Sequence, residues 1–540
     1  MGISGFSNWI KERYWGDLSE SVSFTEIPED ITFGHYLIDF NNVLHEFRIE
    51  IEDFSEEQKN VLSSMTDEEK DNYVIEQVIL KTQVMYENFL PRFTFGLFMD
   101  GVVSMQKVNL KREVAHLHNF FNYTLKNRVY DPTTEQNYNP LQGISHLNAG
   151  TPFMDKLELK LRERFNGPNV FISGSREPGE GEHKIIEYIS RLHDSENIMI
   201  YGNDSDLVIL SMLLEKRIFV RRSEETGNIY IDVNRLSRDI YSWVNGRIIE
   251  VRKKLEFRRF IYDFVFLTFF VGNDYIPALK TRKNWNSMKK LLSDYISIIT
   301  YGKRIYYFVD YQNKFKINTV FLRSFLCKIS KKEAENLQYY SEKRLQLQVP
   351  TDKTEEQLVV WRRDHILYNP EYRDYLVPID YSLNGWRQRY NLLMYGNIDP
   401  SDVCFSYFQS LYFCFELYFN KNLNWNFFTR IHDCPLSSDL LSYLDNVPDI
   451  NTIPLPPTGQ PVDVLVQRLL IVPRECFEYL PRPFAEILRE REYDEFYPNG
   501  DLLPKIIWER ESIYSIAVIL PRMNVEFFKN FYEENKHLIN

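Results

Sequence analysis

Short apolar runs alternate with helical patterns over the first 300 residues. Four such runs cover residues 36–40, 95–99, 170–173 and 198–201. Each ends near a glycine or an acidic residue, as is typical of buried parallel strands. Between the last two runs, Ile185, Tyr188, Ile189 and Leu192 recur at the spacing of one helix face. Strands that alternate with helices predict an α/β domain with a mostly parallel sheet.

The pattern changes further along the chain. Residues 217–222 and 229–233 flank a turn and predict a hairpin at an edge of the sheet. Residues 55–71 predict a helical insertion on the surface, and the Lys-, Glu- and Gln-rich residues 331–356 predict a solvated helix or connector. Residues 403–419 are aromatic and helical in pattern, and a proline-rich stretch follows. We therefore expect an N-terminal region 1–310, a charged connector 311–360 and a second region 361–540.

Composition excludes several classes of protein. The 540 residues carry 64 Lys+Arg against 76 Asp+Glu, a formal net charge of -12, which disfavours a general nucleic-acid coat but allows a local basic channel. The sequence contains neither an uninterrupted apolar stretch of about 18 residues, which a membrane span needs, nor a signal-peptide pattern at its start. The five cysteines are scattered without a CxxC pair, which indicates a reducing compartment rather than a disulfide scaffold or zinc knuckle.

Acidic residues follow the predicted strands and one apolar helix. In α/β sheets, functional groups gather at the carboxyl ends of the strands. Carboxylates brought together there would repel one another and take up protons unless cations neutralised them. An all-oxygen ligand set suits Mg²⁺ or Mn²⁺ rather than Zn²⁺, and two such ions can activate water and stabilise a leaving oxygen of a phosphodiester. The set is Asp39, Asp100, Glu180, Glu182, Asp204, Asp206 and Asp274.

Local spacing adds detail to this acidic set. Asp204 and Asp206 point the same way if the chain there is extended. Glu180 and Glu182 can share a site only at the non-helical start of a helix, and Gly181 between them permits a tight backbone path. Taken singly, an acidic residue at a strand end is more often a helix cap or turn former. The ordered set is what favours a metal site.

Two stretches of the chain are long and specific: PGEGEHKI at residues 178–185 and FVGNDYIP at residues 270–277. Together with the acidic set, they resemble the motifs of the Xrn-type 5′→3′ exoribonucleases, which are relatives of flap endonucleases and PIN-like nucleases. The opening residues 1–14, the first acidic motif at 37–45 and Asp100-Gly101-Val102 also match. Looser matches follow at residues 385–387, 425–427, 432–440 and 496–498.

The resemblance implies a PIN/flap-endonuclease-like sheet flanked by helices, with a second, largely helical region completing the active-site cleft. It implies processive hydrolysis of single-stranded RNA from a 5′-monophosphate end to mononucleotides, as in mRNA decay. Its cofactor would be Mg²⁺ or Mn²⁺, two ions, held by the seven acidic residues. The chain would lack the C-terminal accessory domains of the large cytoplasmic enzymes, and this compact core with divergent motifs favours a viral lineage.

The resemblance also assigns substrate contacts. Lys107, Lys111 and Arg112 would bind the 5′-phosphate, although for Lys111 and Arg112 a solvated helix face is an equal alternative. Val114 and Ala115 stand where the family has two arginines, and neither can grip phosphate, so we expect a weaker preference for a 5′-monophosphate.

Two further residues would hold the terminal base. His45 and Phe427 would clamp it by stacking, with core packing as the alternative for Phe427 and Trp425 as the next stacking candidate.

Two other functions compete with this interpretation. A structure-specific 5′ DNA or flap nuclease would need a duplex-binding helix-hairpin-helix, which is not recognisable in the sequence. A catalytically weak RNA-binding protein is disfavoured because all seven acidic positions are filled. We expect a cytoplasmic monomer that acts on 5′-monophosphorylated single-stranded RNA, away from membranes. The sequence identifies no protein partner such as a decapping enzyme.

Overall fold

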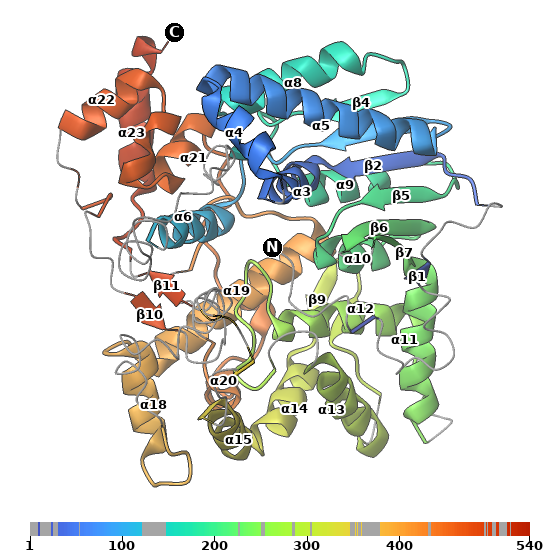
Figure 1. Cartoon of the computed structure of the whole chain (residues 1–540). Helices are drawn as coiled ribbons and strands as arrows, with labels where there is room; N and C mark the ends of the chain where they lie inside the picture. Colours follow the sequence, from blue (N-terminus) through green and yellow to red (C-terminus); the bar gives the residue numbers. More distant parts are fainter. Residues whose placement is uncertain are drawn as a thin grey trace.

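The computed structural model contains a seven-stranded sheet with helices on both faces and a largely helical second region beside it (Figure 1). Residues 1–8, 11–14 and 432–433, which belong to matched motifs, lie outside the described part of the chain. The described residues are 9–10, 23–24, 31–52, 54–120, 147–224, 227–249, 254–282, 287–302, 305–345, 351–352, 354, 358, 379–429, 434–490, 493, 495–498, 504–506, 516–518 and 520–539.

The sheet has the strand order β1-β7-β6-β5-β2-β3-β4. The four strands expected from the apolar runs are confirmed, and they pair in parallel. The expected hairpin is confirmed as the antiparallel pair β6 and β7, but the two-residue β1 lies outside it at this edge. The strands are β1 (Ser23–Phe24), β2 (His35–Asp39), β3 (Thr94–Phe98), β4 (Val170–Ser173), β5 (Ile198–Tyr201), β6 (Ile218–Glu224) and β7 (Gly227–Asp232).

Strand register brings the carboxyl ends of the parallel strands to one edge of the sheet. Asp39, the last residue of β2, pairs with Phe98, the last residue of β3. Phe98 pairs in turn with Ser173 at the end of β4, and Ile38 pairs with Tyr201 at the end of β5. The loops that follow these strands therefore begin close together, at the same edge of the sheet.

Helices cover both faces of the sheet because its central strands are apolar on both sides. Tyr36 and Ile38 belong to a core shared with α3, α5 and α8, whereas the alternate residue Leu37 belongs to the core shared with α9 to α12 (Figure 1). The expected insertion at 55–71 is helical and comprises α4 and the start of α5. These helices are α3 (Phe40–Glu52), α4 (Glu56–Ser64), α5 (Asp67–Phe89), α8 (Pro152–Arg164), α9 (Gly181–Ser190), α10 (Ser205–Met212), α11 (Val233–Arg247) and α12 (Phe257–Thr268), which the 3-10 turn η5 (Phe269–Val271) continues.

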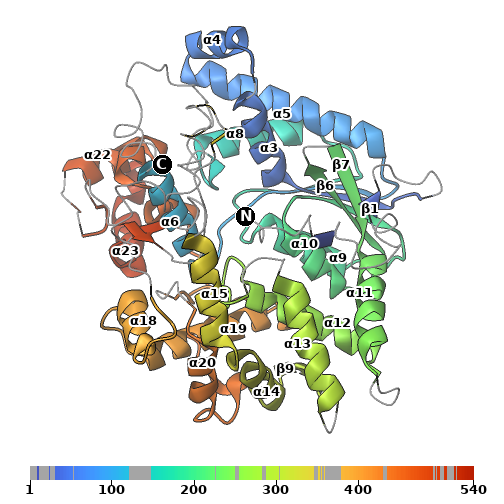
Figure 2. The same cartoon turned by 60° about the horizontal axis from the view of Figure 1, so that its bottom comes forward.

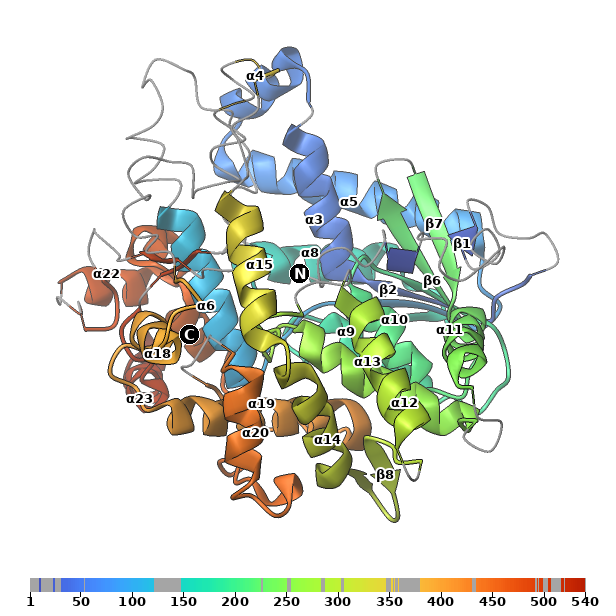
Figure 3. The same cartoon turned by 90° about the horizontal axis from the view of Figure 1, so that it is seen from below.

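The second region packs on the far side of α12. Its central helix α19 contributes Phe408 and Leu411 to the same continuous core that contains Leu37 of the sheet. Helix α20 contacts α14 and α19, as the turned views show (Figure 2, Figure 3). The elements between residues 288 and 452 are α13 (Met288–Tyr301), β8 (Val309–Tyr311), β9 (Phe315–Ile317), α14 (Thr319–Ser330), α15 (Glu333–Leu345), α18 (Trp386–Tyr395), α19 (Pro400–Asn420), α20 (Ser437–Leu444) and η8 (Ile450–Thr452). The division at 310 and 360 stays a prediction, and this core crosses it.

Helix α6 (Met105–Phe120) leaves the sheet and packs among C-terminal elements. Figure 1 shows it, in blue, beside the orange and red helices. Val108 of α6 shares an apolar core with Leu469 of α21 and Phe528 of α23. The C-terminal elements are α21 (Val464–Ile471), η9 (Arg474–Tyr479), α22 (Arg482–Glu490), β10 (Pro504–Ile506), β11 (Ile516–Val518), α23 (Val525–Asn535) and η11 (Lys536–Leu538). None of the helices in the described ranges is long and apolar enough to cross a bilayer.

Candidate active site

Two of the predicted acidic residues lie at neighbouring strand ends. Asp39 ends β2, and Asp100 follows β3 by two residues. The side chain of Asn41 in α3 accepts a hydrogen bond of 2.9 Å from the main-chain N–H of Asp100. The N–H of Gly181, the first residue of α9, donates to Oδ1 of Asp100 at 2.9 Å. Hydrogen bonds from α3 and α9 thus fix the loop that carries Asp100.

The PGEGE turn contributes Glu180 and Glu182. Glu180 is the extended N-cap residue of α9, and Glu182 is in the first helical turn, so both lie at the helix start as expected. Gly181 is required there, because a Cβ at this position would lie 2.8 Å from Oδ1 of Asp39. The buried ammonium group of Lys184 donates to the carbonyl oxygens of Met99 (2.8 Å) and Gly174 (3.0 Å), which ties this turn to β3 and β4.

Asp204 and Asp206 come together by a different route from the one expected. The chain is extended only at Asp204, the N-cap of α10, whereas Asp206 already lies in the first helical turn. Oδ1 of Asp204 accepts a 2.9 Å hydrogen bond from the main-chain N–H of Asp206. The capping geometry therefore replaces the extended chain that the two-residue spacing predicted, because a carboxylate at an N-cap satisfies an otherwise unpaired helical N–H.

Asp274 reaches the same site from the loop after η5. Gly272 has a φ of 87°, and a Cβ there would approach the N atom of Ala278 to 2.6 Å, so the turn needs glycine. The ammonium Nζ of Lys107, from α6, lies 2.5 Å from Oδ2 of Asp274 and 2.5 Å from Oε2 of Glu180. Lys107 thus joins a residue near the end of α12 to the start of α9.

Electrostatic interactions connect all seven carboxylates. Burial, with repulsion from Asp100 and Asp204, raises the pKa of Asp39 well above its usual value. Burial together with Asp204, Asp206 and Glu180 does the same to the pKa of Glu182. For Asp206, burial and repulsion by Asp204 and Asp274 raise the pKa to about 8. Unneutralised, the cluster therefore holds protons at neutral pH.

Two lysines, Lys107 and Lys111, lower the pKa values of two further carboxylates, Asp100 and Asp274. Burial alone would raise the pKa of Asp100, but Lys111, the N–H of Gly181 and Lys107 together hold it well below its usual value. Nζ of Lys111 lies 3.1 Å from Oδ2 of Asp100. The pKa of Asp274 is likewise lowered, because Lys107 outweighs the effect of burial. The site therefore contains both ionised carboxylates and carboxylates that burial and repulsion drive toward protonation.

The donor set suits hard divalent cations. Oδ1 of Asp39 is buried without a hydrogen-bond partner, as expected of an oxygen kept for a cation. The remaining donors are carboxylate oxygens, the preferred ligands of Mg²⁺ and Mn²⁺. Within the described ranges, no three side chains of metal-binding type converge closely enough to hold an ion as they stand. Lys107 explains part of this, because its ammonium group lies between Glu180 and Asp274.

The predicted phosphate-binding residues divide into two groups. Lys107 and Lys111 point at the acidic cluster. Arg112 turns away from it: its guanidinium donates to the carbonyl oxygens of Pro521 (2.8 Å) and Phe496 (3.1 Å) in the C-terminal part of the chain. Val114 and Ala115, which stand where the family has two arginines, differ in burial. Val114 is half-buried, whereas Ala115 is buried in the core of α6 and α21.

The two predicted stacking residues lie in different environments. His45 is half-buried in α3, and burial, with repulsion by Arg48, lowers its pKa to about 4. Phe427 is buried and stacks on Phe413 of α19 with ring centroids 4.9 Å apart, which is core packing. Trp425 is half-buried, and its carbonyl oxygen accepts from the N–H of Met105 at 2.9 Å, at the start of the helix that carries Lys107.

Several residues of the site were not singled out from the sequence. The hydroxyl group of Tyr275 donates to Oε1 of Glu180, and that of Tyr418 donates to Oδ2 of Asp206 at 2.9 Å. Asn42 accepts from the N–H of Asn203 at 3.2 Å and so anchors the loop before Asp204. Tyr275 follows Asp274 directly and could have been noted within its motif. Tyr418 comes from α19, and no sequence pattern indicates its destination.

Parts of this chain are similar to known proteins. Residues 1–224 match the model of the XRN 5′-3′ exonuclease N-terminus. A human protein named 5′-3′ exoribonuclease 1 is 23% identical over 92% of this chain and 32% of its own length. The Saccharomyces cerevisiae protein of the same name is 27% identical over 52% of this chain and 19% of its own length.

A viral protein is also similar. A putative 5′-3′ exonuclease of Acanthamoeba polyphaga mimivirus is 29% identical over 33% of this chain and 32% of its own length. The matched part of this chain thus spans a third or less of each of these three relatives. Residues 1–224 contain the strand ends that carry six of the seven clustered carboxylates, and the match to the human protein continues through the second region. Residues 1–224 of this chain are thus similar to the XRN 5′-3′ exonuclease N-terminus, and the mostly parallel sheet flanked by helices is consistent with that similarity.

Proposed function

We propose that this protein is a metal-dependent 5′→3′ exoribonuclease that degrades single-stranded RNA processively from a 5′-monophosphate end. The observation that carries the proposal is the set of seven carboxylates and two lysines at the carboxyl edge of the sheet. The names of the similar proteins, 5′-3′ exoribonucleases, support the direction and the RNA substrate.

The ligands of two Mg²⁺ or Mn²⁺ ions would be Asp39, Asp100, Glu180, Glu182, Asp204, Asp206 and Asp274. Such ions supply an activated water and stabilise the leaving oxygen of the phosphodiester. The lysines of α6 would supply positive charge for the substrate. Lys107 and Lys111 are held against carboxylates by 2.5 Å and 3.1 Å contacts, and they would attract the terminal phosphate as those carboxylates are neutralised.

The end of the substrate would be recognised less strictly than in relatives with two pocket arginines. Arg112 is committed to main-chain carbonyl groups, and Ala115 lies in a core, so the lysines remain as the cationic groups of this pocket among the described residues of α6. We propose a cytoplasmic monomer that takes part in RNA decay. Its protein partners are left open.

One gel distinguishes this function from its alternatives. RNA with a 5′-phosphate, the same RNA with a 5′-hydroxyl and single-stranded DNA are each incubated with Mg²⁺ or with EDTA. Mononucleotides from RNA alone, only with Mg²⁺, support the proposal. Cleavage of the single-stranded DNA would favour a 5′ DNA nuclease, and binding without cleavage would favour an RNA-binding protein.

Two variants make the gel specific to the site. Asp206→Ala should abolish product formation while RNA binding survives, because it removes a proposed ligand and costs on the order of several kcal/mol of transition-state stabilisation. Asp402→Ala, at an exposed position of α19, is the matched control and should cleave as the wild type does. Normal turnover in Asp206→Ala would contradict the assignment.

A further inference from the structure

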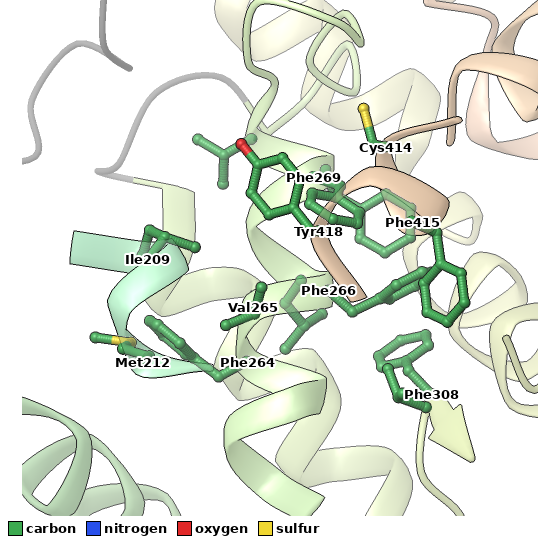
Figure 4. Close-up of a cluster of buried hydrophobic side chains, with 14 of the residues drawn as sticks. Ile209, Met212, Phe264, Val265, Phe266, Phe269, Phe308, Cys414, Phe415 and Tyr418 are labelled. Carbon is green, nitrogen blue, oxygen red and sulfur yellow. The ribbon is translucent and has the colours of Figure 1, made fainter. Parts of the chain in front are cut away.

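Helix α19 brings one polar group of the second region into the acidic cluster. Tyr418 lies one turn after Cys414 on the same face of α19, and its ring packs edge-on against Phe269 with centroids 5.1 Å apart. Figure 4 shows Cys414, Phe415 and Tyr418 of α19 packed against Phe266 and Phe269. The ring is therefore fixed by the apolar core, and the hydroxyl group has one defined position.

That position is against a predicted metal ligand. The Tyr418 hydroxyl donates to Oδ2 of Asp206 at 2.9 Å, and the bond is buried. The side-chain amide of Asn273 in turn lies 3.5 Å from the Tyr418 oxygen, and the thiol of Cys414 lies 3.8 Å from the amide oxygen of Asn273. This chain of contacts continues into Asp274, the neighbour of Asn273.

The hydrogen bond has a consequence for the carboxylate. Asp206 is in the first turn of a short helix, and its Oδ2 accepts the hydrogen bond from Tyr418, so Oδ1 is the oxygen that this bond does not occupy. Groups that hold the second oxygen of a ligating carboxylate orient the first and tune its affinity for the metal. The ring of His183 stands at 77° to that of Tyr418 with centroids 6.2 Å apart, which restricts the tyrosine from the side of α9.

We propose that Tyr418 is a positioning residue through which the second region sets the metal affinity of Asp206. The proposal rests on the metal-dependent activity proposed above. It explains in physical terms why a helix more than 200 residues away from Asp206 in the sequence is part of the active site.

The test compares Mn²⁺ affinity, measured by titration calorimetry on the full chain, between the wild type, Tyr418→Phe and Tyr412→Phe. Phe keeps the ring in the core and removes only the hydroxyl group. Tyr412, on the same helix, bonds Glu416 instead of the cluster and is the matched control. We expect Tyr418→Phe to bind Mn²⁺ about 10- to 100-fold more weakly. Its kcat on RNA should recover as the metal concentration is raised, with KM for RNA unchanged, whereas Tyr412→Phe should match the wild type.

A double-mutant cycle shows whether the effect passes through Asp206. In an Asp206→Asn background, Tyr418→Phe should have little further effect on Mn²⁺ affinity, because the two groups act as one unit. Full additivity, or a wild-type affinity in Tyr418→Phe, would overturn the inference alone if the wild type binds Mn²⁺ and degrades RNA. A wild type that does neither would overturn the proposed function and this inference together.

Discussion

Nζ of Lys107 lies 2.5 Å from Oδ2 of Asp274, at the meeting point of α6 and the loop after α12. The same ammonium group contacts Glu180, so a single lysine forms ion pairs with two carboxylates of the cluster. Burial opposes this charge, yet Asp274, Glu180 and Glu182 raise the pKa of Lys107 well above its usual value. The lysine is therefore a permanent cation inside the site.

Because Lys107 is a permanent cation at this point, we expect it to favour RNA with a 5′-phosphate over RNA with a 5′-hydroxyl. Lys107→Ala should reduce activity on 5′-phosphorylated RNA more than on 5′-hydroxyl RNA, because a charge-assisted contact to phosphate contributes roughly 1.5–3 kcal/mol. The measurement is kcat/KM on both RNAs. Lys160→Ala, at an exposed ion pair of α8, is the control and should change neither value. An equal loss on both RNAs would assign Lys107 to general backbone binding instead.

Metal binding should release protons. Burial and repulsion raise the pKa of Asp206 to about 8 and also raise the pKa of Glu182, so protonation of the metal-free cluster is favoured at neutral pH. A cation must displace these protons, and Mn²⁺ affinity should therefore increase as the pH rises toward about 8 and then level off. Calorimetry in two buffers of different ionisation enthalpy measures the released protons directly. Affinity that does not vary between pH 6 and pH 8.5 would contradict this prediction.

One substitution should strengthen the preference for a 5′-monophosphate. Val114 is half-buried on α6, whereas Ala115 is buried in the core with α21, where overpacking costs about 1–3 kcal/mol. Val114→Arg alone should therefore raise the ratio of activities on phosphate and hydroxyl ends. Adding Ala115→Arg should lower the melting temperature. A ratio that stays unchanged in a folded Val114→Arg protein would place the terminal phosphate elsewhere.

Phe427 and Trp425 should behave differently on truncation. Phe427 is stacked on Phe413 inside the core, so Phe427→Ala should cost about 3–5 kcal/mol of unfolding free energy. Trp425 is half-buried beside the start of α6, and Trp425→Ala should shorten each processive run, since a stacked base contributes about 1–3 kcal/mol. Denaturant titration measures the first effect and product-length distributions measure the second. A stable Phe427→Ala protein with short runs would reverse the assignment.

Buried Asp263 in α12 should make stability depend on pH. Burial raises its pKa to about 8, although the main chain at Phe308 and Val309 and the hydroxyl of Tyr295 donate hydrogen bonds to it. Because the folded pKa exceeds the unfolded value of about 3.9, the contribution of Asp263 is complete below about pH 4 and is lost as the pH rises to 8. The loss is about 1.4 kcal/mol for each pH unit in that window.

Asp263→Asn removes the titrating group; its amide oxygen can still accept from the main chain, and its amide nitrogen can donate to the hydroxyl oxygen of Tyr295. The difference in unfolding free energy between Asp263→Asn and the wild type should therefore grow in favour of the variant from pH 5 to pH 8. Denaturant titrations at several pH values measure this difference. Asp402→Asn, at an exposed site, should track the wild type throughout.

The sequence predicted the parts of the fold that depend on local pattern. The strands that end at Asp39 and Tyr201 are apolar on both faces, and that pattern alone specifies a buried parallel strand. The clustering of the acidic residues could be anticipated for the same reason, since parallel strands end at one edge. The position of Asp206 in the first turn of a helix could not be anticipated, because a spacing of two residues does not distinguish an extended segment from a helix cap.

The contributions of distant segments were beyond the reach of local pattern. Arg112 looks like a phosphate ligand until Pro521 and Phe496 present their carbonyl groups to it. Phe427 looks like a stacking residue until α19 supplies Phe413 as its partner. In both cases the deciding contact lies in another element, and a single sequence carries no record of which elements will meet.

The dependence of α6 on distant segments also affects the order in which the protein can fold during its synthesis. The helix bearing Lys107 rests on α21, and the N–H of Val103 just before it donates to the side chain of Gln467 at 2.8 Å. A ribosome makes all five parallel strands long before it reaches residue 467, and domains fold as they emerge. A nascent chain can thus complete its sheet while the helix with the lysine still lacks its support. Competence to cut RNA would therefore arise only after α21 (Val464–Ile471) has been synthesised.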